Sequence, residues 1–197
     1  RTRLEKATGP LETAGGSADA RRPGDGLLDA VVLAQAGLAR LGYDAHITEV
    51  LPIELSLPAA GQAALAIETV DASAAAAICA QLEEVRSSQA VRAERAVLAR
   101  LQGGCTLPVA AHAVHEGDTL YLRALLGGPA GEGPISLTGG EAQSITLLRA
   151  EARGPASDPL TLGTLVAERL LEAGGAPLLE RSRLGAAGLP APQRSRS

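Results

Sequence analysis

The stretch from Leu101 to Val109, which reads Leu-Gln-Gly-Gly-Cys-Thr-Leu-Pro-Val, separates two kinds of sequence pattern. Before it, apolar residues recur at helical spacing, and after it they alternate with polar residues. Adjacent glycines are typical of a helix end, and a proline soon afterwards prevents the helix from continuing. We therefore expect Cys105 on a loop just beyond a helix, where a reagent can reach its thiol. The alternative is a small core residue, as most cysteines are.

Two helices are predicted before this stretch. Asp71 or Ser73 is placed to cap an alanine-rich helix that carries Cys79, and Ser88 is placed to cap the second helix. The second helix has one apolar face, formed by residues at helical spacing: Ala90, Ala93, Val97 and Leu101. Gly103 and Gly104 are predicted to end it.

Three strands and one helix are predicted after Pro108. The strands are expected at residues 109–115, 119–126 and 144–152, with a turn at 116–118 between the first two. The helix begins at Asp158-Pro159 and closes at Gly174-Gly175. This pattern indicates a small α+β domain.

The first part of the chain predicts a different kind of unit. Residues 29–34 form a short continuous apolar run, which suits a strand buried on both faces of an α/β sheet. A short helix follows and stops at Gly42. Leu51-Pro52 and Leu57-Pro58 then interrupt regular structure, which suggests a connection between domains.

Composition limits the possible partners and compartments. The net charge is −4 and the pI is about 5.4, so the chain has no basic field to attract nucleic acid. The 197 residues contain two cysteines, which give no disulfide framework, and no apolar run long enough to span a bilayer. We therefore expect a cytoplasmic protein. Without Phe, Trp or Met, its core must be built from Leu, Val, Ile and Ala.

Other chemistry-bearing residues have ordinary interpretations. His46, His112 and His115 show no metal-ligand spacing with either cysteine, and the last two are expected on strand faces. Glu94 and Arg95 are expected on the solvated side of their helix or in an ion pair at a domain contact. No metal site is predicted.

Several blocks of this sequence, taken in order, resemble the porphobilinogen deaminase (hydroxymethylbilane synthase) family. They are Thr-Arg-Leu at 2–4, Asp-Ala-Val-Val-Leu-Ala at 29–34, Ala-Gly-Leu-Ala-Arg-Leu-Gly at 36–42, Leu-Pro-Ala-Ala-Gly-Gln at 57–62, Ala-Glu-Arg-Ala at 93–96 and Gly-Gly-Cys at 103–105. The resemblance extends from Arg3 to about Leu179 and covers only the C-terminal portion of the family's protein. This chain departs from the family pattern at Ala63 and Ala66, which replace glycines, and in its longer loop at 7–26.

The resemblance implies a multidomain protein of α/β and α+β class. Part of a periplasmic-binding-protein-like α/β domain pair is followed by a small three-stranded α+β domain. The implied divisions are the C-terminal part of the second α/β domain (1–57), a hinge crossing with helices returning to the first domain (58–102), the C-terminal domain with the cofactor cysteine (103–183) and a disordered tail (184–197).

The resemblance also assigns four cofactor-binding residues. Cys105 falls on the cysteine that holds a dipyrromethane cofactor through a thioether. Arg3 and Arg40 fall on arginines that bind the acetate and propionate groups of the cofactor and growing chain, and Gln62 lies where the interdomain crossing passes the cofactor. Without the resemblance, Arg3 is a frayed end, Arg40 a charge at a helix C-terminus and Gln62 a hinge amide bonded to backbone.

The implied activity is that of a transferase in tetrapyrrole and haem biosynthesis, which joins four porphobilinogen molecules into hydroxymethylbilane with loss of ammonia. Its partners are porphobilinogen and the growing polypyrrole chain, and the complete enzyme is expected to be a monomer. The family's catalytic aspartate is matched by none of Asp19, Asp25, Asp29 or Asp44, so we expect it upstream of Arg1 and expect this stretch alone, a fragment, to be inactive. The alternatives are a non-catalytic ligand-binding module of the same fold and a pseudoenzyme that folds with a partner.

Overall fold

The structure is a computed structural model that describes residues 30–102, 107–129 and 145–187. The chain divides into two compact units, Arg1–Pro52 and Ile53–Ser197. Each unit is described by itself. The division falls at Leu51-Pro52, the first of the two predicted interruptions.

The described part of the first unit contains one short helix and one 3₁₀ turn. Helix α2 spans Gln35–Arg40, and the turn spans Asp44–His46. The helix ends as predicted, because Gly42 takes a left-handed φ of +71° just beyond it.

The prediction of a strand at 29–34 was wrong for residues 30–34, the part that the structure describes. These residues form no regular structure, and Val32 is 76% exposed. A strand requires a neighbouring backbone for its hydrogen bonds, and the described residues of this unit supply none. An apolar run can show that a segment is suited to a sheet, but it cannot supply the sheet.

The second unit begins with the predicted helical pair. Helix α3 spans Ala74–Cys79 and continues as a 3₁₀ turn at Ala80–Leu82, and the long helix α4 spans Val85–Arg100. The Ser73 hydroxyl accepts a hydrogen bond from the Ala76 amide at 3.1 Å, so the predicted cap of α3 is confirmed.

The predicted cap of α4 was wrong. The cap is Glu84, whose carboxylate oxygens accept from the Arg86 amide at 3.0 Å and the Ser87 amide at 2.6 Å. Ser88 lies inside the first turn, and its hydroxyl donates to Glu83. A carboxylate takes two free amides where a hydroxyl takes one, and its charge is favourable at a helix N-terminus.

The three predicted strands form one antiparallel sheet in the order β1-β2-β3. Strand β1 spans Val109–Glu116, β2 spans Thr119–Pro129 and β3 spans Ile145–Pro155. The predicted turn between β1 and β2 contains Gly117 at a φ of +66°. The small α+β domain is therefore confirmed, whereas the periplasmic-binding-like domain pair remains a prediction.

Two helices follow the sheet. Helix α5 spans Pro159–Leu170 and is capped by Asp158, as predicted. The chain then kinks through a π turn at Leu171–Gly175, where Gly174 has a φ of +101°, and resumes as α6 at Ala176–Ala187. The glycines therefore bend the helix but do not end the helical region, which passes the predicted domain end at 183 and enters the predicted tail.

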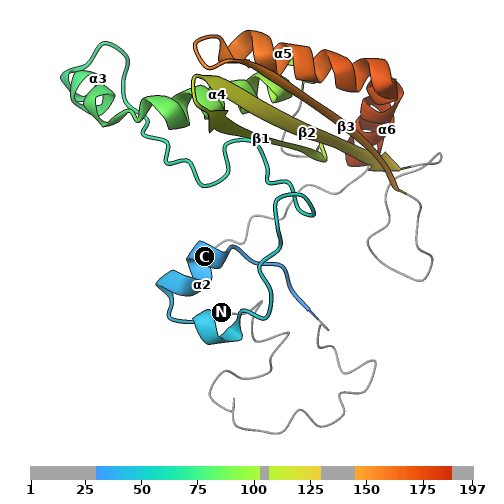
Figure 1. The fold of residues 1–197 in the computed structure, drawn as a ribbon, viewed down its shortest axis with the longest axis horizontal. Coiled ribbons are helices and arrows are strands. Elements are labelled where there is room, and N and C mark those ends of the chain that lie inside the picture. Colours follow the sequence, from blue (N-terminus) through green and yellow to red (C-terminus); the bar gives the residue numbers. More distant parts are fainter. Residues whose placement is uncertain (1–29, 103–106, 130–144, 188–197) are drawn as a thin grey trace, which may run out of the picture. The chain divides into compact units, whose positions relative to one another are not determined.

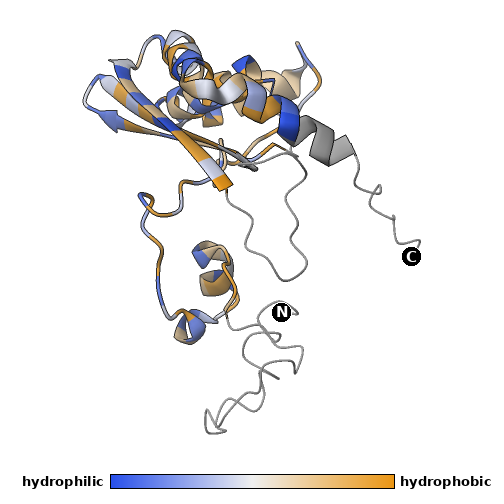
Figure 2. Ribbon diagram, turned by 90° about the vertical axis from the view of Figure 1, so that its right-hand side faces the viewer, coloured by the Kyte–Doolittle hydropathy of each residue, from blue (hydrophilic) through white to orange (hydrophobic). Residues whose placement is uncertain are grey.

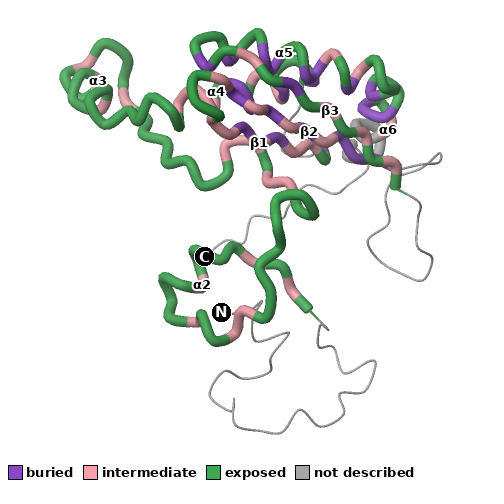
Figure 3. Tube along the Cα trace, viewed as in Figure 1, coloured by how far each residue is buried: buried purple, intermediate pink, exposed green. Residues whose placement is uncertain are grey.

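Helices α4 and α5 cover one face of the sheet, and the core lies between these two layers (Figure 1, Figure 3). Alternate β2 residues point into this layer, where they meet the inner sides of both helices. The largest fully buried side chains in the described part of the chain are Val97, Leu101, Leu120, Leu122, Leu126, Val166, Leu170 and Leu178. The core is aliphatic, as the composition predicted, and hydrophobic residues alternate with hydrophilic ones along the strands in Figure 2.

Candidate functional site

The structure describes two of the four predicted site residues. Arg40 and Gln62 lie in described segments, whereas Arg3 and Cys105 lie outside them. Arg40 belongs to the first compact unit and Gln62 to the second, so each is considered in its own surroundings.

The segment that carries Cys105 joins α4 to β1, and the core anchors both of its ends. On one side, Leu101 is 1% exposed and Gln102 takes a left-handed φ of +52° directly after the helix. On the other side, Leu107 is 9% exposed, and the Pro108 carbonyl accepts from the Gly127 amide at 2.9 Å. The helix ends just before the two predicted cap glycines, which lie outside the described residues, and the left-handed residue after it is Gln102, where glycine would be usual.

Arg40 is the last residue of α2, and its side chain is exposed. A cation at this position interacts favourably with the helix dipole, which is the alternative role given above. The same position leaves the guanidinium open to a ligand carboxylate.

Gln62 lies in a tight turn between two residues with left-handed backbone. Gly61 has a φ of +73° and Ala63 a φ of +69°, while the Gln62 amide donates to the Ala59 carbonyl at 3.0 Å. The Gln62 side chain is exposed. Ala63 therefore occupies the kind of backbone conformation that favours glycine, which is the residue that the family pattern carries there.

The prediction that Glu94 lies on the solvated side of its helix was wrong, whereas the alternative, an ion pair at a domain contact, remains a prediction. Glu94 is 6% exposed, and its two carboxylate oxygens accept from the Gly61 amide at 2.6 Å and the Ala113 amide at 2.8 Å. The sequence held a signal for this burial, because Glu94 precedes Val97 and Leu101 by three and seven residues and so shares their apolar face. Its neighbour Arg95 is exposed, as predicted.

The two histidines of β1 lie on the strand, as predicted, and both contact α4. His115 Nε2 lies 2.9 Å from the Arg86 carbonyl oxygen, and His112 Nδ1 lies 3.7 Å from a Glu94 oxygen. Within the described segments, no three His, Cys, Asp or Glu side chains come together as a metal site would require.

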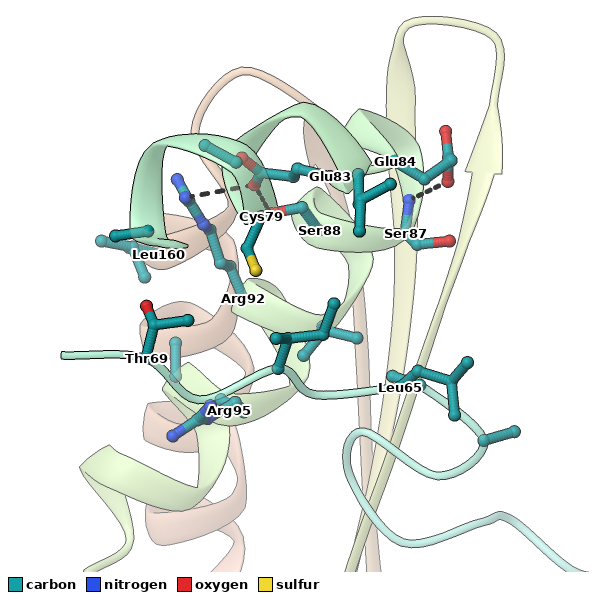
Figure 4. A pocket seen from close by; sticks show the side chains of 18 of the residues that line it. Leu65, Thr69, Cys79, Glu83, Glu84, Ser87, Ser88, Arg92, Arg95 and Leu160 are labelled. Atoms are coloured by element: carbon teal, nitrogen blue, oxygen red, sulfur yellow. Dashed lines mark hydrogen bonds and ion pairs between the residues drawn. The ribbon is translucent and has the colours of Figure 1, made fainter. Parts of the chain in front are cut away.

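A groove of about 1130 Å³ lies beside α4 in the second unit (Figure 4). It is lined by the extended segment after the Gln62 turn, by α3 and by the outer side of α4. Cys79 is half-buried in its wall, and Leu65 is 93% exposed at its edge. Arg92 forms an ion pair with Glu83 at 3.5 Å. The groove offers apolar surface, a thiol and four charged side chains, those of Glu83, Glu84, Arg92 and Arg95.

The sheet face opposite the helices carries paired charges. Arg153 donates to both carboxylate oxygens of Glu116, at 2.8 and 3.2 Å, and this hydrogen bonding holds the pKa of Glu116 below its ordinary value. The Tyr121 hydroxyl donates to Glu151 at 2.5 Å, which raises the pKa of Tyr121, and Arg153 stacks on the Tyr121 ring. These groups meet one another's hydrogen-bonding and charge requirements, so we assign them no ligand.

No helix in the described segments has the length and apolar character needed to cross a membrane.

Comparisons with known proteins assign both units to one family. The model described as "Porphobilinogen deaminase, dipyromethane cofactor binding domain" matches residues 12–77, which include Arg40 and Gln62. The model described as "Porphobilinogen deaminase, C-terminal domain" matches residues 88–172, which include Glu94 and Cys105. Arg3 lies outside both matches.

A curated relative agrees with the two family models. The porphobilinogen deaminase of Syntrophus aciditrophicus (strain SB) is 41% identical over 162 residues, which are 81% of this chain and 48% of that protein. The chain thus spans about half the length of this relative. Two models of one family match in succession, and the relative aligns with most of the chain. The chain therefore belongs to the porphobilinogen deaminase family.

Proposed function

We propose that this chain is the C-terminal part of an enzyme that joins four porphobilinogen molecules into hydroxymethylbilane with loss of ammonia. The observation that carries the proposal is the agreement between the two family models and the 41% identical relative. Porphobilinogen and the growing polypyrrole chain are the proposed ligands. A cytoplasmic location and a monomeric complete enzyme are proposed with them.

Cys105 is the proposed attachment point of the dipyrromethane cofactor. Three features support it: the Gly-Gly-Cys block, its position within the C-terminal-domain match, and the buried residues Leu101 and Leu107 on either side. A thioether forms when a thiolate attacks an electrophilic carbon, and a thiolate is a far better nucleophile than a hydroxyl group. Anchored flanks would restrict the position of a group attached between them.

Arg40, Arg3 and Gln62 are the proposed noncovalent contacts. The acetate and propionate groups of pyrrole intermediates are carboxylates, which a guanidinium binds in a two-pronged, permanently charged contact. Exposure of Arg40 and Gln62 is compatible with this role. Their place within the match to the cofactor-binding domain supports it further.

The proposed division of the chain follows the family pattern. Residues 1–57 complete the second α/β domain, residues 58–102 form the crossing and returning helices, and residues 103–183 form the C-terminal domain. The compact units divide at Pro52, close to the first of these boundaries.

Intact mass spectrometry of a complete deaminase carrying this sequence, purified from a haem-producing host, tests the proposal. We expect a mass increase equal to one dipyrromethane, which peptide mapping places on Cys105. An unmodified chain, or an adduct on Cys79, would overturn the assignment of Cys105. Porphobilinogen consumption by the 197-residue chain alone is expected to be negligible. Measurable turnover would show that a residue of this chain takes the role of the family's catalytic aspartate.

A second candidate function is a non-catalytic module of the same fold that acts with another polypeptide. The observation that favours it is the groove beside α4, whose apolar residues include the exposed Leu65, Ile67 and Leu82. Such a module does not need Cys105. The mass measurement therefore separates the two candidates, because only the deaminase predicts the adduct.

A further inference from the structure

We propose that Glu94 is a positioning residue, which fixes the turn carrying Gln62 against the edge of the sheet. The inference rests on the proposed function insofar as Gln62 contacts the cofactor. The positioning itself is a property of the described geometry.

One carboxylate joins three segments that are distant in sequence. Glu94 projects from α4, its Oε2 accepts from Gly61, 33 residues earlier, and its Oε1 accepts from Ala113, 19 residues later. Both bonds, at 2.6 and 2.8 Å, have the length of charge-assisted hydrogen bonds. Burial of the carboxylate shields them from competing water.

The donor from the sheet is available because β1 is an edge strand. In the order β1-β2-β3, no strand of the described segments pairs with the other side of β1, so its outward amides need other acceptors. The Ala111 amide donates to the Pro58 carbonyl at 3.1 Å, and the Ala113 amide donates to Glu94. Two alternate amides of β1 thus hold the turn. The Ala111 amide binds it directly, and the Ala113 amide binds it through the Glu94 carboxylate.

The turn needs such an external contact. Residues with left-handed backbone stand on both sides of Gln62, and one of them, Ala63, carries a side chain. A conformation of this kind persists when surrounding contacts fix it. Because Glu94 binds the amide directly before Gln62, it determines the direction in which the Gln62 side chain leaves the turn.

The substitution Glu94→Gln tests this role with almost no change in side-chain volume. An amide offers one acceptor oxygen, so it can satisfy one of the two backbone donors and must turn its NH₂ group toward the other. Glu168→Gln is the matched control, because Glu168 makes a 2.6 Å contact with Arg100 at the surface and touches neither donor.

The first measurement is amide hydrogen exchange by NMR in the 197-residue chain. We expect Glu94→Gln to speed exchange at Gly61 or Ala113 by about tenfold or more, the effect of losing a hydrogen bond to a charged group. Amides in α5 should exchange at the wild-type rate, and Glu168→Gln should leave both donors unchanged. Unchanged exchange at Gly61 and Ala113 in Glu94→Gln would overturn the proposal.

The second measurement separates positioning from simple stabilisation. A synthetic dipyrromethane bearing acetate and propionate groups is added, and the side-chain amide signals of Gln62 are followed. We expect the shift in these signals to shrink in folded Glu94→Gln and to persist in Glu168→Gln. If both variants respond like the wild type, Glu94 contributes stability alone. If the wild type gives no response, the assignment of Gln62 to the cofactor fails, while the exchange result still decides the role of Glu94 in fixing the turn.

A third measurement applies if Glu94→Gln does not fold. In the wild-type chain, scalar couplings across the hydrogen bonds should connect the Gly61 and Ala113 amide nitrogens to the Glu94 carboxyl carbon. Their absence would overturn the proposal without any variant.

Discussion

The α-carbon of Gly163 on α5 lies against the Ala93 carbonyl of α4, so closely that an added Cβ would stand 2.3 Å from that oxygen. It would also stand 2.5 Å from the Ala96 side chain. The two helices that cover the sheet can therefore approach each other this closely only because Gly163 has no side chain.

Gly163→Ala should destabilise the second unit by about 1–3 kcal/mol or more, because the obstacle is backbone and the helices must separate. Urea unfolding followed by circular dichroism measures the change. Gly154→Ala is the control, since its nearest contact is the end of the Leu162 side chain at 3.2 Å, which can move. Equal losses in both variants would contradict the close crossing.

Ala63→Gly should stabilise the chain by about 1 kcal/mol, because it removes the strain of alanine at a φ of +69°. Ala66→Gly is the matched control: both positions carry glycine in the family pattern, but of the two only position 63 has a positive φ in the described structure. Glycine at 66 should lower stability slightly through greater freedom in the unfolded chain. A gain at both positions would show that backbone conformation is not the cause.

The Glu116–Arg153 pair should make stability depend on pH. The pKa of Glu116 is lowered in the folded chain, so its contribution is present above the ordinary carboxyl pKa and is lost as pH falls through the folded value. Wild type and Glu116→Gln should therefore differ in urea midpoint at neutral pH and converge on acidification or at high salt. A difference that is constant across this range would exclude the carboxylate as its source.

The two cysteines should behave differently on substitution. In a complete deaminase carrying this sequence, Cys105→Ser should abolish the dipyrromethane adduct, because a hydroxyl group is a poor nucleophile, and should leave the fold intact. Cys79→Ser should retain the adduct, with little loss of stability, since Cys79 is only half-buried in the groove wall. Intact mass and urea midpoint are measured for both variants. Loss of the adduct in Cys79→Ser alone would reverse the assignment.

Arg40→Leu should impair elongation in a complete deaminase carrying this sequence, because it removes a two-pronged contact from an exposed position without opening a core cavity. Single-turnover assays should show accumulation of short pyrrole intermediates. Arg40→Lys keeps the charge but loses the two-pronged contact, so its elongation rate should lie between those of the wild type and Arg40→Leu. Unchanged elongation in Arg40→Leu would return Arg40 to its role at the helix end.

Local signals predicted most of the second unit. The change from helical spacing to alternation located the sheet, and the Glu-Gly-Asp turn at 116–118 located its first connection. The apolar face of α4 was read correctly because Ala93, Val97 and Leu101 all pack in the core. Each of these features depends on residues near one another in the chain.

The errors concern features that depend on distant partners. The apolar run at 29–34 carries no information on which strands are available to pair with it. Glu94 appeared to be solvated because its partners, Gly61 and Ala113, come from segments that meet only in the folded unit. For Cys105, the sequence predicts a loop just beyond a helix end, whereas the burial of Leu101 and Leu107 on either side depends on the folded core.

The order β1-β2-β3 has a consequence for synthesis on the ribosome. Each strand pairs with the one made immediately before it, and α4 precedes all three, so this part can assemble as it emerges. Helices α5 and α6 come last and close over apolar residues that would otherwise stay open to other nascent chains. A pause in translation after β3 should therefore favour aggregation, whereas a pause after α6 should be harmless.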